Sequence, residues 1–145
     1  MMHTYNEDIL AWSMEQAQLI RAGRFDLVDI EHVAEEIEDV GKSEQRELTS
    51  RMSVLLAHLL KWQYQPERRG ASWERTIRAQ RKEIAYHLDD TPSLKPKLLE
   101  PRWLDMVWSK ALAQATTETG LDCFPETCPW LMDDEILNAC WFPET

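Results

Sequence analysis

The chain has 145 residues, of which 43% are hydrophobic and 29% charged, and its formal net charge is -10 at pH 7. This length predicts one domain over residues 1–145 that buries a core without metal or disulfide. The opening residues, MMHTYNEDIL, lack the basic and apolar stretches of a secretion signal, and no apolar run approaches the ~20 residues of a membrane span. We therefore expect a cytoplasmic protein without a membrane partner, whose three cysteines are free thiols.

Charge is unevenly distributed along the chain. Residues 1–50 hold 12 acidic and 4 basic residues, residues 51–110 hold 7 and 12, and residues 111–145 hold 7 acidic and no basic ones. Acidic ends around a basic middle favour neutralisation inside the protein and argue against nucleic acid as a partner. The alternative is charge scattered over a solvated surface.

The first expected helix begins after Asn6, a good cap, and ends at Gly23. Its apolar stripe contains Leu10, Met14 and Ala17. A second helix, capped by Asp29, has apolar residues at 3-4-3 spacing, namely Ile30, Val33, Ile37 and Val40. Both stripes predict faces that pack against the core.

The apolar stripe disappears between Val40 and Leu48. Gly41 as a helix stop and Ser43 as a new cap predict a tight turn there, and one continuous, bent helix over residues 29–62 is the alternative. The stripe then resumes with Leu48, Met52, Leu55, Leu59 and Trp62, which predicts a buried helix.

Further helices follow this segment. Ser72 is expected to cap a fourth helix, and Pro101 and Gly120 are expected to start and end a longer one. The tail, residues 121–145, contains one short helical candidate over 133–140 and enough aromatic residues to pack back on the other helices. The sequence thus predicts an all-α fold: an antiparallel helical bundle of about four core helices over residues 6–120, with an extra C-terminal helix and an irregular tail containing Pro and Trp.

A candidate polar pocket is expected where helices meet, because several ionisable side chains border apolar stripes. Its residues are Glu35, Glu38, His58, Lys61 and Arg81. Charges at that depth must be paired. The cluster either fixes helix register, or it forms a pocket with His58 as an acid–base group and Arg81 as an anion clamp.

A candidate binding edge follows in the basic middle of the chain. Its residues are Trp62, Arg68, Arg69, Trp73, Arg75 and Arg78. We expect the two indoles near one end of the bundle, with Arg68 or Arg69 across them as a cation–π lid. The edge could bind a protein partner or phosphates; alternatively, arginine stems simply pack on tryptophan and pair with glutamate.

Recognised chemical motifs do not appear in the sequence. No Glu-x-x-His pair, CxxC, GxSxG or glycine-rich phosphate loop is present. We therefore assign no catalytic residue and expect neither a metal nor a cofactor.

The blocks LLAHLLKWQYQPERRGASWERTIRAQR, FDLVDIEHVAEEIEDVGKSEQRE, DDTPSL and FPETCP resemble the uncharacterised bacterial family called domain of unknown function 29. The resemblance spans roughly residues 5–129 and implies an all-helical cytoplasmic bacterial protein without an established activity. From the residues we favour a non-enzymatic protein-interaction role, adaptor or antitoxin-like. The alternatives are an enzyme or ligand binder using the polar pocket, and a phosphate or nucleic-acid binder using the binding edge.

Overall fold

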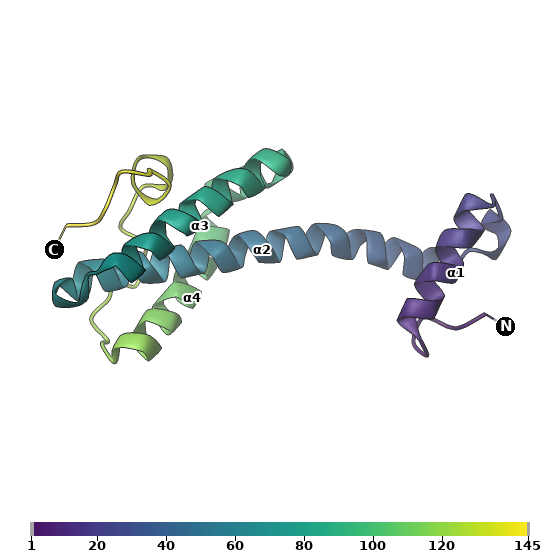
Figure 1. Cartoon of the computed structure of the whole chain (residues 1–145), viewed down its shortest axis with the longest axis horizontal. Helices are drawn as coiled ribbons and strands as arrows, with labels where there is room; N and C mark the ends of the chain where they lie inside the picture. The colour runs from purple at the N-terminus through teal and green to yellow at the C-terminus, as the bar shows by residue number, and fades with distance from the viewer. Residues whose placement is uncertain (1, 145) are drawn as a thin grey trace. The chain divides into compact units, whose positions relative to one another are not determined.

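The computed structural model describes residues 2–144, and these contain helices and no strand. The all-α prediction is therefore confirmed. Contacts group the chain into an N-terminal unit that ends at Glu44 and a C-terminal unit that begins at Gln45 (Figure 1). This grouping does not test whether the chain folds as one domain, so that expectation stays a prediction. Across the described residues, every helix is too short or too polar to cross a bilayer.

The N-terminal unit contains helix α1, Ile9–Arg21, and the first part of α2. The side chain of Asp8 caps α1 by accepting a hydrogen bond from the Ala11 N–H at 3.1 Å, so the predicted cap at Asn6 was wrong by two residues. Gly23 follows α1 with a φ of 73°, a left-handed conformation that glycine adopts without strain. The short 3-10 turn Phe25–Leu27 then leads to α2.

Helix α2, Ile30–Tyr64, is continuous over 35 residues. The tight turn predicted at Gly41 and Ser43 was therefore wrong, and the continuous alternative is confirmed. Glycine inside a helix costs only about 1 kcal/mol relative to alanine. The polar residues that follow are compatible with a helix, and the Glu47 and Arg51 side chains pair one turn apart at 3.0 Å.

The C-terminal unit combines the rest of α2 with helix α3, Ala71–Asp90, a 3-10 segment, Pro92–Leu99, and helix α4, Pro101–Thr119. Figure 1 shows α3 and α4 alongside this part of α2. Helix α3 begins at Ala71 with Gly70 as its N-cap, so the predicted cap at Ser72 was wrong by two residues. Helix α4 begins at Pro101 and ends at Thr119, and Gly120 closes it with a φ of 75°, as predicted.

The core lies in the C-terminal unit. Among the residues that the structure describes, 17 buried apolar residues form it, namely Leu48, Met52, Leu55, Leu56, Ala57, Leu59, Leu60, Ile77, Ile84, Leu88, Leu94, Trp103, Val107, Trp108, Ala111, Ala115 and Ile136. The two core indoles satisfy their N–H groups, Trp103 with the Thr49 hydroxyl at 3.1 Å and Trp108 with the Pro125 carbonyl at 2.9 Å. The second bond joins α4 to the C-terminal segment, where the predicted short helix is a single π-helical turn, Met132–Ile136.

Candidate interaction surface

An aromatic and polar cluster holds the N-terminal unit together. The Tyr5 ring stacks on His32 at 4.2 Å and meets the edge of Trp12 at 4.9 Å. The Trp12 indole donates a hydrogen bond to Asp29 at 3.0 Å, and the Tyr5 hydroxyl donates one to Glu36 at 2.5 Å. These bonds connect α1 and the residues before it to the start of α2.

Hydrogen bonding within this cluster shifts two pKa values. The bond to Glu36 raises the pKa of Tyr5 to about 12, because the phenol loses a good acceptor when it ionises. His32, and after it the Trp12 indole, lowers the pKa of the Asp29 carboxyl by bonding to its charged form. The Asp29 backbone N–H also donates to the buried Gln16 side chain at 2.7 Å.

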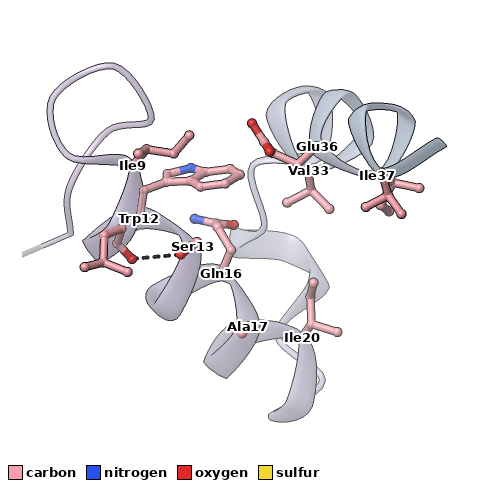
Figure 2. A pocket seen from close by; sticks show the side chains of 11 residues that line it. Ile9, Trp12, Ser13, Gln16, Ala17, Ile20, Val33, Glu36 and Ile37 are labelled. Atoms are coloured by element: carbon pink, nitrogen blue, oxygen red, sulfur yellow. Dashed lines mark hydrogen bonds between the residues drawn. The ribbon is translucent and has the colours of Figure 1, made fainter. Parts of the chain in front are cut away.

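Beside the cluster lies an open groove of about 550 Å³ between α1 and α2 (Figure 2). Its walls are mostly aliphatic, and Figure 2 shows Trp12 and Gln16 of α1 and Val33 and Ile37 of α2 pointing toward the space between the two helices. The lining residues are Ile9, Leu10, Trp12, Ser13, Gln16, Ala17, Ile20, Val33, Glu36, Ile37 and Val40. The Ser13 hydroxyl donates to the Leu10 carbonyl at 2.8 Å, so it offers little polarity to the groove.

Apolar exposure is concentrated in this unit. Among the residues described, 14 large hydrophobic side chains are exposed, and ten of them precede residue 45. The ten are Met2, Ile9, Leu10, Met14, Ile20, Phe25, Leu27, Ile30, Ile37 and Val40. Trp12 is the one hydrophobic residue classed as buried in the described part of this unit, whereas the C-terminal unit buries 17. Five of the ten, Ile9, Leu10, Ile20, Ile37 and Val40, line the groove between α1 and α2. Apolar side chains gathered on one exposed surface mark interaction sites.

The stripes of the first two predicted helices therefore do not face a core. Leu10 and Met14 of α1 and Ile30, Ile37 and Val40 of α2 are exposed, which corrects the expectation that both stripes pack inward. The periodicity correctly indicated helices with an apolar face. It did not indicate that the face would lie at the surface of its own chain.

The residues of the candidate polar pocket fall into separate places. Glu35 and Glu38 are exposed in the N-terminal unit, whereas His58, Lys61 and Arg81 belong to the C-terminal unit. His58 and Lys61 do lie together, since His58 Nε2 is 3.5 Å from Lys61 Nζ.

Lys61 is buried, and its ammonium bonds to the carboxylate of Glu118, which was not among the predicted pocket residues. Lys61 Nζ donates to Glu118 at 2.5 Å and lies 5.3 Å from the centre of the Trp73 ring. Burial lowers the pKa of His58, whose Nδ1 lies 2.9 Å from the Val54 carbonyl. Because 57 residues separate Lys61 from Glu118, only the packing of α4 against α2 brings them together.

Arg81 anchors the C-terminal segment. Its guanidinium donates to the carbonyls of Ile136 at 2.8 Å and Glu135 at 3.3 Å, and it lies 5.5 Å from the centre of the Phe142 ring. Burial lowers the pKa of Arg81 to about 10. Its bonding to these carbonyls is a structural role, and its action as an anion clamp stays a prediction.

The candidate binding edge is partly assembled. Arg69 lies 5.2 Å from the Trp62 ring centre and donates to the Trp62 carbonyl at 2.6 Å, while Phe142 packs on the same indole at 4.7 Å. Trp73 contacts Lys61 instead. The three remaining arginines of the edge are exposed, namely Arg68, Arg75 and Arg78. Among them, Arg78 pairs with Glu74 at 2.7 Å.

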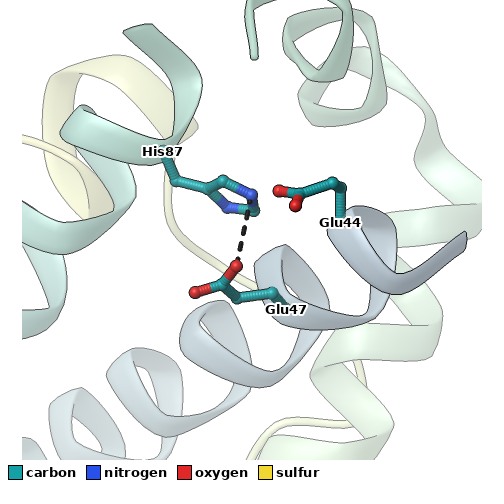
Figure 3. Close-up of side chains that lie close together, drawn as sticks. All are labelled: Glu44, Glu47 and His87. Carbon is teal, nitrogen blue, oxygen red and sulfur yellow. Dashed lines mark ion pairs between the residues drawn. The ribbon is translucent and has the colours of Figure 1, made fainter. Parts of the chain in front are cut away.

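Glu47 and His87 form an ion pair that joins α2 to α3 inside the C-terminal unit. His87 Nε2 of α3 lies 3.5 Å from a Glu47 oxygen of α2, and the imidazole is buried (Figure 3). Glu44, also drawn in Figure 3, precedes Glu47 by one turn of the same helix. This pair could not be predicted from the sequence, because His87 and Glu47 are 40 residues apart and no local spacing links them.

The fold and the surface define a class: an all-α protein with one well-packed unit and one unit that exposes an apolar groove. A family model described as domain of unknown function DUF29 matches residues 4–142, which is nearly the whole chain. The protein belongs to this family, as the resemblance predicted. Comparisons with curated proteins and with solved structures gave no match.

Proposed function

We propose that the protein has a non-enzymatic protein-interaction role in the cytoplasm, and that the N-terminal unit is its docking element. A second polypeptide chain covers the groove between α1 and α2. One observation carries this proposal: the unit leaves most of its large hydrophobic side chains in solvent. Adaptor and antitoxin-like activities are two forms of this role.

The energetics of the unit support docking. The N-terminal unit buries little apolar surface of its own, and hydrogen bonds such as Trp12 to Asp29 and Tyr5 to Glu36 make only modest net contributions to its stability. A second chain in the groove would add the hydrophobic burial that the unit lacks. The polar-pocket and phosphate-binding alternatives remain predictions. They receive less support, because His58, Lys61 and Arg81 are engaged with one another or with neighbouring protein groups.

Site-specific photo-crosslinking tests the proposal. A photoreactive phenylalanine derivative replaces Ile37, which lines the groove and is 67% exposed. The matched control replaces Leu99 of the C-terminal unit, which is 80% exposed. We expect irradiation of cells to yield a polypeptide adduct from position 37 and none of that mass from position 99. The proposal fails if position 37 gives no polypeptide adduct, or if both positions give the same adducts.

A further inference from the structure

We propose that the chain in the groove is a second copy of this protein, so that two N-terminal units pack face to face about a two-fold axis. This inference rests on the proposed function and names its partner. In such an arrangement each copy contributes α1 and the first part of α2, and the apolar faces of these four helices become a shared core. Each unit offers both a groove and the exposed side chains that fill the groove of its copy.

The spacing of apolar residues along the first part of α2 fits packing against other helices. Ile30, Val33, Ile37 and Val40 recur at alternating intervals of three and four residues, the a and d positions of a heptad repeat. This narrow stripe is typical of helix–helix seams. β-Branched side chains at both kinds of position suit assemblies of more than two helices. Two copies of the N-terminal unit supply four helices.

The exposed area also fits a dimer. The groove-lining aliphatic residues together with Met14 and Ile30 expose the equivalent of about four whole side chains. At roughly 100 Å² of apolar area each, this amounts to roughly 400 Å² per copy. A standard interface buries about 800 Å² per partner, slightly more than half of it apolar. The surface of one unit is therefore what a specific dimer needs from each copy.

Electrostatic repulsion does not oppose the packing of a second copy at this interface. Residues 1–44 contain 11 acidic and 3 basic residues, but Glu31, Glu35 and Glu38 lie roughly 150° around α2 from its apolar stripe. Two copies that pack through their stripes keep these carboxylates in solvent. Glu36, the acid that lines the groove, accepts a hydrogen bond from Tyr5. A basic partner helix would find few carboxylates beside the groove.

Sedimentation equilibrium of the full chain over about 1–100 µM tests the inference. We expect a monomer–dimer equilibrium that added salt leaves unchanged or strengthens, because salt screens the repulsion between two acidic units. Ile37→Glu should weaken the dimer at least about 30-fold, since it places a charge in an apolar interface. Leu99→Glu should leave the dissociation constant within about threefold of the unmodified value. Circular dichroism confirms that each variant keeps its helices, and Leu10→Glu repeats the test from α1.

The outcomes separate this inference from the proposed function. An unmodified chain that stays monomeric at the highest concentration overturns self-association. If a different polypeptide then crosslinks at position 37, the docking role stands with another partner. A dimer that neither Ile37→Glu nor Leu10→Glu weakens uses another surface, which also overturns the inference. Weakening by both groove variants but not by Leu99→Glu supports it.

Discussion

Trp108 connects the helical core to the C-terminal segment, and its replacement should be costly in two separable steps. The side chain is fully buried on α4, its indole donates to the Pro125 carbonyl at 2.9 Å, and Trp130 packs on it with ring centres 5.5 Å apart. Trp108→Ala removes a large buried side chain, and such changes cost about 3–5 kcal/mol. Trp108→Phe keeps most of the volume but leaves the Pro125 carbonyl without its donor, a loss of about 1–3 kcal/mol.

Urea unfolding monitored by circular dichroism measures both losses as changes in the free energy of unfolding. A total stability of about 5–15 kcal/mol means that Trp108→Ala removes a large share of it. Tyr86→Ala is the matched control, because Tyr86 is a 55% exposed aromatic residue of α3, and we expect a change within about 0.5 kcal/mol. A loss below about 1 kcal/mol for Trp108→Ala would contradict the packing described for the C-terminal unit.

Three further predictions concern the polar contacts. Asp29→Asn should loosen the N-terminal unit and speed hydrogen exchange in α1. Because the folded pKa of Asp29 is lowered, its contribution to stability is present above the ordinary aspartate pKa and is lost as pH falls through the lowered value. Unchanged exchange of α1 in the variant would contradict this prediction. Glu118→Gln should lower the free energy of unfolding by about 1–2 kcal/mol, less than the loss of a fully buried ion pair, because Glu118 is partly exposed. In urea unfolding, the difference from the unmodified chain should shrink as pH falls through the lowered pKa of Glu118. Arg81→Met should release the Glu135 and Ile136 carbonyls and make the C-terminal segment more sensitive to limited proteolysis, whereas Lys82→Met, at an exposed neighbouring position, should not.

Local signals accounted for much of the fold. Gly23 and Gly120 end their helices in left-handed conformations that side chains avoid, so their positions could be predicted from sequence. The stripe from Leu48 to Leu59 identified the buried face of α2 because its periodicity matches a helix that packs on one side. Gly41 misled the prediction, since a single glycine does not end a helix whose next turns are compatible with helix formation.

The candidate site was harder to predict, because periodicity shows that a face must be covered and not what covers it. Ile37 and Val40 have the same pattern as core residues, and their exposure follows from tertiary structure alone. The pairs Lys61–Glu118 and Glu47–His87 join residues far apart in sequence, so they depend on how α3 and α4 pack on α2. The resemblance to the family indicated the helical fold but assigned no function to any residue.

Hydrogen exchange of the N-terminal unit at two protein concentrations tests most directly whether a second copy covers the groove. We expect backbone amides of α1 and of residues 30–40 to exchange slowly in concentrated protein and markedly faster after dilution below the dissociation constant. Amides of α4 should exchange at the same rate in both samples, because the core around Trp108 lies within one chain. Equal exchange of α1 and residues 30–40 at both concentrations, in a chain that is monomeric throughout, would contradict the account.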